Sequence, residues 1–160
     1  MNPVDPVESN GICDDEGNEN VQQYRREAEL GSASAQHKLA RFYQKGSNGV
    51  AKDRKKAAFW FRKAAKQGYA KAQYRLGMCR LWGKGVSEDD DKAVKWLRRA
   101  AEQGYAKAQY ELGECYHRGF GVDEDEQEAV SWYQKSARQG YRRAISTLEG
   151  RGMDVDFLNG

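Results

Sequence analysis

Two stretches of the sequence are nearly the same and lie 36 residues apart: AKQGYAKAQYRLGMCRLWGKGV at residues 65–86 and AEQGYAKAQYELGECYHRGFGV at residues 101–122. Residues 28–50 (AELGSASAQHKLARFYQKGSNGV) repeat the pattern with one additional residue. Residues 137–152 (ARQGYRRAISTLEGRG) begin a further copy, which then stops. Self-similarity at a fixed period of roughly 20–50 residues is the sequence signature of repeat architectures. The chain is therefore expected to be an array of one structural unit.

The first half of each unit is predicted to be a helix with one apolar face. Ala72 and Leu76 are four residues apart, which places them on the same side of a helix. The other copies have the same pair at Ala35/Leu39, Ala108/Leu112 and Ala144/Leu148. Gly77 and Gly113 follow the leucines and would allow a second helix to approach closely. Glycines at positions 31, 68, 104 and 140 precede these helices, where left-handed backbone is expected.

Glycines and an aspartate then mark the change to a second helix. Gly83 and Gly85 break the first helix, and Asp89 is suited to cap the next one. The other copies have Gly46, Gly49 and Asp53, and Gly119, Gly121 and Asp125. An apolar stripe follows at Ala57/Trp60/Ala64, Ala93/Trp96/Ala100 and Ala129/Trp132/Ser136. We expect the tryptophan to fill the space that the small residues leave, and stacked units to bury a continuous core.

This order of residues resembles the Sel-one-like repeat, a relative of the tetratricopeptide repeat. The resemblance covers residues 28–152 and departs at the Ser47-Asn48 insertion and at the last copy, which lacks a second helix. It implies an all-α fold, a right-handed α-α superhelix (alpha solenoid) of antiparallel helix pairs. About three full repeats are expected, at 31–67, 68–103 and 104–139, with a partial repeat at 140–152. The family also implies a concave groove, lined by the first helices and used for protein–protein contact.

The two ends of the chain are expected to differ from the repeats. Residues 1–19 are acidic, contain Pro, Gly and Asn and have little to bury, so they are predicted to be a disordered tail. The solenoid is expected to occupy residues 20–152, with residues 20–30 as a leading helical cap. Residues 153–160 are predicted to be a C-terminal tail or cap, in which Phe157 and Leu158 fold over the last apolar face.

Charge is distributed unevenly along the chain. The net charge is −6 over residues 1–20, +13 over residues 21–84 and −4 over residues 85–160, although the whole chain carries only +3. A molecule polarised in this way can steer charged partners towards one end. Alternatively, the acidic tail can fold back on the basic part.

Composition argues against several other classes of protein. There is no run of 18 apolar residues and no signal peptide, so a cytoplasmic protein without a membrane span is the default expectation, with leaderless secretion left open. Cys13, Cys79 and Cys115 lack the spacing of a zinc site or a disulfide framework, and the last two are predicted to be buried thiols. The acidic runs at 88–91 and 123–126 are interpreted as helix starts rather than metal loops, and no cofactor is expected.

The face opposite the Ala/Leu stripe on each first helix is the predicted partner-binding surface. Large apolar side chains with cations beside them are typical of an interface hot spot. The alternative for Leu81 and Trp82 is that they pack against the loop of the next repeat. The predicted partner-binding residues are Arg41, Lys71, Tyr74, Met78, Leu81, Trp82, Lys107, Tyr110, His117 and Arg118.

A second candidate surface lies on the predicted second helix of the first repeat. Phe59 stands among cations, and the equivalent positions in the other repeats are Lys95 and Ser131, which suits a solvent-exposed site. An exposed Phe ringed by cations could bind an acidic, apolar peptide or a nucleic acid. The alternative is an ordinary solvated helix face. The residues of this secondary basic face are Lys55, Phe59, Arg62, Lys63 and Lys66.

These features favour an interaction scaffold or adaptor that binds another protein or peptide, and the basic segment is compatible with an acidic partner. The alternative is binding of nucleic acid or another polyanion by the basic first repeat, although paired base-reading residues are absent. No enzyme is expected, because His37 and His117 are isolated and Gly83-Lys84-Gly85 lacks the spacing of a phosphate loop. The open ends of a short array predict a monomer or a weak homodimer.

Overall fold

The structure is a computed structural model that describes residues 21–153 and 155. Within these residues all regular structure is helical, and no strand occurs. Residues 21–29 form a helix that leads into the numbered elements. These are α2 Ala33–Lys45, α3 Arg54–Lys66, α4 Ala70–Leu81, α5 Asp90–Glu102, α6 Ala106–Arg118, α7 Glu126–Ala137 and α8 Arg142–Gly150. The prediction of an all-α fold is confirmed.

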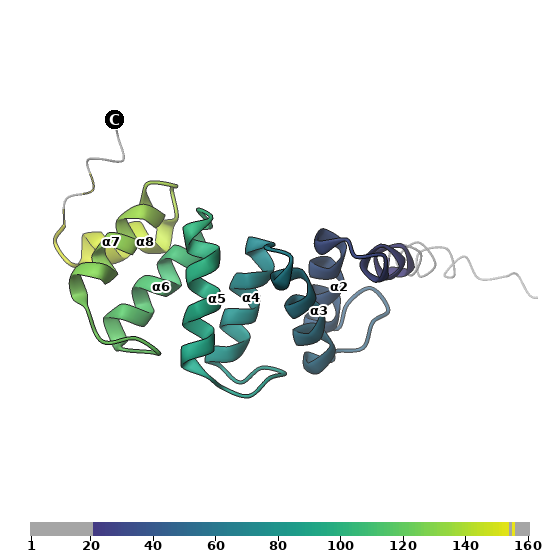
Figure 1. The fold of residues 1–160 in the computed structure, drawn as a ribbon. Coiled ribbons are helices and arrows are strands. Elements are labelled where there is room, and N and C mark those ends of the chain that lie inside the picture. The colour runs from purple at the N-terminus through teal and green to yellow at the C-terminus, as the bar shows by residue number, and fades with distance from the viewer. Residues whose placement is uncertain (1–20, 154, 156–160) are drawn as a thin grey trace, which may run out of the picture.

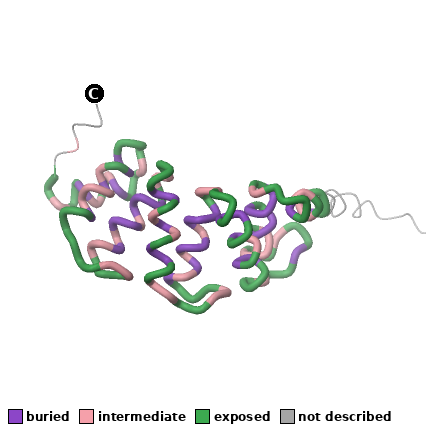
Figure 2. Tube along the Cα trace, in the orientation of Figure 1, coloured by how far each residue is buried: buried purple, intermediate pink, exposed green. Residues whose placement is uncertain are grey.

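The helices form pairs that stack into an elongated array (Figure 1). Helix α2 packs with α3, α4 with α5, and α6 with α7. Each pair also contacts the next one, through α3 and α4, α5 and α6, and α7 and α8. Buried residues run along the middle of the array, and the residues of the loops are largely exposed (Figure 2). Because neighbouring units share this core, the predicted alpha solenoid is confirmed.

The two helices of a pair approach closely at a glycine. A Cβ atom added at Gly77 would lie 2.8 Å from Cγ of Leu97 in the partner helix. One added at Gly113 would lie 2.7 Å from Cε1 of Tyr133. Carbon atoms in contact are ordinarily about 3.5–4.0 Å apart. The missing side chain therefore sets how closely α4 packs on α5 and α6 on α7, as the sequence predicted.

The side chain that fills this contact is not the predicted tryptophan. The fully buried residues are Phe61, Leu97 and Tyr133. The tryptophans one position earlier, Trp60, Trp96 and Trp132, are only half-buried. Cations lie over their rings, with Lys63 Nζ 5.0 Å from the centre of Trp60 and Lys135 Nζ 3.9 Å from that of Trp132. The prediction is wrong because the second helix turns the next residue towards its partner and leaves each tryptophan at the edge, where cations cover it.

The predicted helix boundaries are confirmed in all three repeats. The side chains of Asp53, Asp89 and Asp125 each accept a hydrogen bond from the backbone N–H three residues later. This satisfies one of the N–H groups that a helix start leaves without a partner. The turn before Asp89 needs glycine, because Gly85 has a φ of +78° and its Cα lies against the backbone of Arg54 in the preceding repeat. That contact also docks the loop of one repeat onto the second helix of the repeat before it.

Buried glutamines link each first helix to its neighbours on both sides. Gln73 Nε2 donates to the carbonyl oxygen of Ala65 at the end of α3, at 3.2 Å. Its Oε1 accepts a 2.7 Å hydrogen bond from Gln103 at the end of α5. The same chain of bonds is found for Gln36 (with Ala28 and Gln67) and for Gln109 (with Ala101 and Gln139). The partial repeat has Ile145 at this position, so it lacks this link.

Two features of the remaining described residues complete the fold. Cys79 and Cys115 are buried free thiols, as predicted, and burial raises the pKa of the Cys115 thiol to about 12. None of the helices in residues 21–153 combines the length and the apolar character that crossing a bilayer requires. Val155 is half-buried and packs against the last core cluster. The predicted acidic tail, Cys13, Phe157 and Leu158 lie outside the described residues.

Candidate partner-binding surface

One face of the array is formed by the outward side chains of the first helices α2, α4, α6 and α8, and we call it the first-helix face. Along each helix these residues are spaced by three or four positions, so they share one side of it. Those that are exposed or half-buried are Lys38, Arg41 and Lys45 on α2, Lys71, Arg75, Met78 and the adjoining Trp82 on α4, Lys107, Glu111, Glu114 and Arg118 on α6, and Arg143 on α8.

Three of the predicted partner-binding residues are not exposed on this face. Tyr74, Leu81 and Tyr110 are buried, with at most 9% of their surface accessible. Tyr74 contacts the Tyr105 ring edge-on, with centres 5.3 Å apart, and Tyr110 packs in the same way on Tyr141 at 5.5 Å. The expectation that they face solvent is wrong, because a first helix is covered both by its own partner helix and by the tyrosine that begins the next repeat.

Other predicted residues keep some exposure but differ in their surroundings. Lys71, Lys107, Arg41 and Arg118 are exposed, and Met78 is half-buried against the core. His117 does not join the others, since its Nδ1 lies 2.8 Å from a carboxylate oxygen of Glu126 at the start of α7.

Trp82 is the large apolar residue that stands out on this face, with 55% of its surface exposed. It lies beside Phe120, 37% exposed, although the two residues are 38 positions apart in the sequence. Together with Leu81 they line two adjoining cavities of about 220 and 170 Å³. These volumes are below the roughly 300–1,000 Å³ of small-molecule sites, so each suits one side chain of a partner.

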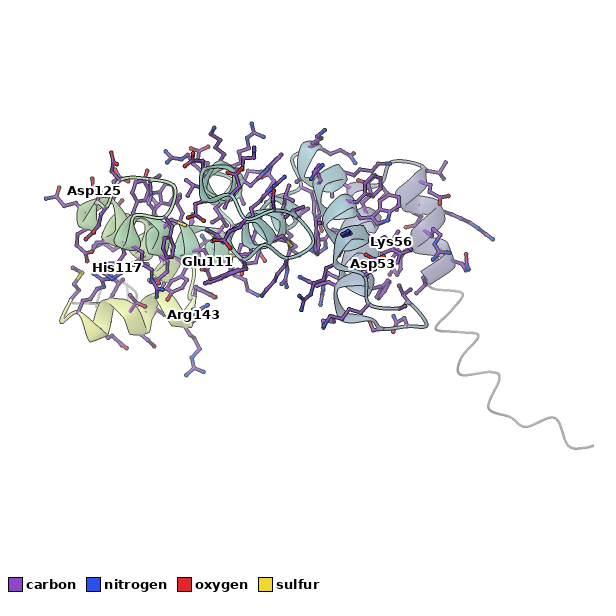
Figure 3. The ribbon with its side chains drawn as sticks, turned by 90° about the horizontal axis from the view of Figure 1, so that it is seen from below. Asp53, Lys56, Glu111, His117, Asp125 and Arg143 are labelled. Atoms are coloured by element: carbon purple, nitrogen blue, oxygen red, sulfur yellow. The ribbon has the colours of Figure 1, made fainter. Side chains whose placement is uncertain are left out.

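We call the two cavities lined by Leu81, Trp82 and Phe120 the aromatic cleft. Charged groups of α6 and α8 surround it and are paired with one another. Arg143 lies 3.3 Å from a carboxylate oxygen of Glu111, and the two residues come from neighbouring first helices (Figure 3). Arg118 lies 3.1 Å from Glu114, which also accepts a 2.7 Å hydrogen bond from the Tyr133 hydroxyl. Burial raises the pKa of the Glu111 carboxyl, and the cation of Arg143 opposes this rise. This half of the face is therefore close to electrically neutral.

The half of the face formed by α2 and α4 carries only positive charge. The positive charges of Lys38, Arg41, Lys71 and Arg75 act on the buried His37. Burial, followed by the charges of these four residues, lowers the pKa of the His37 imidazole to about 4. Within the described residues, none of the four lies within 4 Å of a carboxylate. This half therefore presents an uncompensated positive field.

The secondary basic face is on the outer side of α3. Phe59 is 50% exposed, as the sequence predicted, and packs edge-on against Trp60. Lys63 Nζ lies 5.0 Å from the centre of the Phe59 ring. Lys55, Arg62 and Lys66 are exposed on the same helix. Lys63 therefore already covers the Phe59 ring, so Phe59 is less accessible to a partner than Trp82 is.

Sequence reasoning missed four residues that the structure brings to the first-helix face. They are Lys38, Arg75, Glu111 and Phe120. Phe120 had a detectable signal, since an apolar ring in a glycine turn replaces Lys84 of the preceding repeat. Lys38 and Arg75 also had a detectable signal, because they occupy equivalent positions of consecutive repeats and are both cationic. Glu111 takes the same position in the third repeat, where the sign of the charge reverses.

Several solved structures are similar to this one. The c5321 protein, a protective antigen of uropathogenic Escherichia coli strains with an SLR fold, is 39% identical with a TM-score of 0.75, and the match covers 81% of this chain and 29% of that one. A Sel1 repeat protein from Oxalobacter formigenes is 37% identical with a TM-score of 0.74, covering 82% and 98%. Cysteine rich protein B of Helicobacter pylori shares the fold at 23% identity and a TM-score of 0.65, covering 84% and 96%. No curated protein sequence matches the chain.

The sequence profile of the Sel1 repeat matches three consecutive segments, residues 33–69, 70–105 and 106–141. Each match begins at the first helix of a pair and ends at the tyrosine before the next first helix. Together they span well over half of the chain and contain the capping aspartates and the buried glutamines described above. The chain belongs to the Sel1 repeat family.

Proposed function

We propose that this chain is an interaction scaffold or adaptor that binds a partner protein through the first-helix face, with Trp82 and Phe120 as the apolar anchor. Sel1 repeat proteins are in general scaffolds for protein–protein interaction. The observation that carries the proposal is the aromatic cleft, where two exposed rings from different repeats line the same cavities. Buried aromatic anchors with charged residues at the rim dominate the binding energy of many interfaces.

The residues that repeat along the chain serve its architecture, and those on the first-helix face vary from repeat to repeat. Trp82 takes the place of Lys45 in the first repeat and of Arg118 in the third. A tryptophan that only stabilised the array would be expected in every copy. Its single occurrence on an exposed position supports a role in recognition.

The experiment is quantitative affinity capture from lysate of cells that naturally express the protein. The full-length chain is compared with the variants Trp82→Ala and Phe120→Ala, and with Phe59→Ala as the matched control. Phe59 is also an exposed aromatic, but it lies on α3, outside the first-helix face. Thermal melts monitored by circular dichroism show whether each variant keeps its fold.

We expect one partner to be lost with both cleft variants and retained with Phe59→Ala. Loss with Phe59→Ala alone would move the interface to the secondary basic face, and a nuclease-sensitive capture there would favour nucleic acid. Unchanged capture in all three variants would contradict the proposed anchor.

A further inference from the structure

We propose that the α2 and α4 half of the first-helix face binds an acidic segment of the partner protein, whose carboxylates are held by Lys38, Arg41, Lys71 and Arg75. This inference rests on the proposed scaffold function and specifies the chemistry of its partner. The site is separate from the aromatic cleft, so the two parts of the surface can be tested independently.

The two halves of the first-helix face differ in how their charges are compensated. On α6 and α8 the acidic and basic side chains are paired, as in Glu111 with Arg143 and Glu114 with Arg118. On α2 and α4 every charged side chain of the face is cationic, and within the described residues none of the four cations of the proposed site lies within 4 Å of a carboxylate. Like charges that are held close together repel one another, and a ligand that brings negative charge relieves this repulsion.

The four cations share an electrostatic effect on one buried group. All four perturb the same buried imidazole, that of His37, and each lowers its pKa. The buried ring stands at the position that Tyr74 and Tyr110 occupy in the following repeats, between the rings of Phe61 and Tyr69 at 5.7 and 5.3 Å. With a pKa of about 4, the His37 imidazole is neutral near pH 7 and adds no charge of its own.

A cavity of about 300 Å³ lies beside two of these cations, Lys38 and Arg41. Lys38, Arg41 and Lys45 line it on the α2 side. The rings of Tyr24 and Phe42, 5.8 Å apart, form an apolar part of the wall. The opposite rim comes from Ser47 and Asn48, the insertion that distinguishes the first repeat from the others. The cavity therefore combines positive charge, apolar surface and polar groups, which suits amino-acid side chains.

A protein segment fits this face better than a nucleic acid. A nucleic acid carries negative charge at every nucleotide, and a strand that continued along the face would meet Glu111 and Glu114 on α6. A peptide can change character along its length, with acidic residues over α2 and α4 and an apolar side chain at Trp82. The distribution of charge on the face matches that change.

The test measures fluorescence anisotropy of a fluorescein-labelled hexaglutamate peptide with the full-length chain, and hexaglutamine serves as the uncharged probe. The main variant is Lys71→Glu/Arg75→Glu, and Lys38→Glu/Arg41→Glu is an independent second variant. The control Lys55→Glu/Lys66→Glu changes the net charge by the same amount on the outer side of α3. An oligothymidylate of equal charge tests the nucleic-acid alternative.

We expect wild type to bind hexaglutamate and not hexaglutamine, with affinity that falls as salt is raised. Each cluster variant should weaken binding by about tenfold or more, which corresponds to roughly 1.4 kcal/mol, whereas the control should stay within about threefold. An equal loss of affinity in the control would show that binding depends only on the net charge of the protein, and it would overturn the proposed site. Absence of binding, or tighter binding of oligothymidylate that depends on the same residues, would overturn it as well.

The probe contains no apolar anchor, so Trp82→Ala should leave hexaglutamate binding unchanged. A failure of the peptide test with intact capture through Trp82 would reject the acidic site alone. A positive peptide test with no partner lost in Trp82→Ala or Phe120→Ala would reject only the proposed anchor.

Discussion

The side-chain amide of Gln103, at the end of α5, donates a 2.7 Å hydrogen bond to the side-chain oxygen of Gln73 on α4. Gln73 in turn donates to the carbonyl oxygen of Ala65 in the preceding repeat. One buried amide therefore holds three helices from two repeats. A solenoid is stabilised mainly by contacts between neighbouring units. These hydrogen bonds cross such a contact and are therefore expected to contribute to the stability of the fold.

Replacing Gln73 with alanine should destabilise the chain. The change removes two hydrogen bonds, one from Gln103 and one to Ala65, and each contributes about 0.5–1.5 kcal/mol net, so the expected loss is about 1–3 kcal/mol. Urea denaturation monitored by circular dichroism measures the free energy of unfolding. Gln127→Ala, at an exposed position in the first turn of α7, is the matched control and should change it little. Equal effects of the two substitutions would contradict the structural role of Gln73.

Gly113→Ala should destabilise the pair formed by α6 and α7. The added methyl group would lie 2.7 Å from Cε1 of Tyr133 and 3.1 Å from the carbonyl oxygen of Ala129, so the helices must move apart. Overpacking of this kind typically costs about 1–3 kcal/mol. Gly150→Ala is the control, because no atom lies within 4 Å of its added Cβ. That variant should be neutral or gain up to about 1 kcal/mol from helix propensity, and both are measured in the same urea experiment.

The stability of the first repeat should depend on the protonation of His37. Burial and four nearby cations lower the pKa of its imidazole from 6.5 to about 4 in the folded state. Between these pH values the unfolded chain binds more protons, so the contribution of His37 to stability is complete above pH 6.5 and is lost as the pH falls towards 4.

The variant His37→Tyr isolates this effect, because tyrosine occupies the same position in the next two repeats and a phenol carries no charge in acid. Free energies of unfolding are compared for wild type and variant between pH 7 and pH 4. The difference should change by up to about 3 kcal/mol, with wild type losing more stability in acid. Parallel curves for the two proteins would contradict the lowered pKa.

The thiols of Cys79 and Cys115 should react slowly in the folded protein. Burial raises the pKa of both, and that of Cys115 to about 12, so little thiolate is present near pH 8. Alkylation by iodoacetamide, followed by peptide mass spectrometry, reports each cysteine separately. Both should be labelled much faster in urea than in buffer, with Cys115 the slower in buffer. Equal rates in the two solvents would show that the thiols are accessible.

The local architecture could be predicted from the sequence because each signal acts over a few residues and occurs in several copies. Asp53, Asp89 and Asp125 cap their helices through backbone groups three positions away. The glycine at Gly85 is required by its own φ and by a close contact. Ala72 and Leu76 are buried because a four-residue step keeps both on one side of the helix.

The candidate surface could be predicted only in part. The period of a single helix identifies its most apolar side, but α4 and α6 are covered on two sides, by a partner helix and by the next repeat. Tyr74 and Tyr110 are therefore buried, although the period of a single helix predicts that they face solvent. The contact with Gly77 is made by Leu97 and not by the neighbouring tryptophan, because α5 turns Leu97 towards α4.

The sequence by itself thus determined the repeat, its helix pairs, its turns and the uneven distribution of charge. Only the tertiary structure decided that Trp82 and Phe120 share one cleft, and that Glu111 of α6 is paired with Arg143 of α8. Repeat identity follows from short-range patterns along one helix. The surface depends on side chains 30 or more positions apart, and their meeting is set by how consecutive repeats stack.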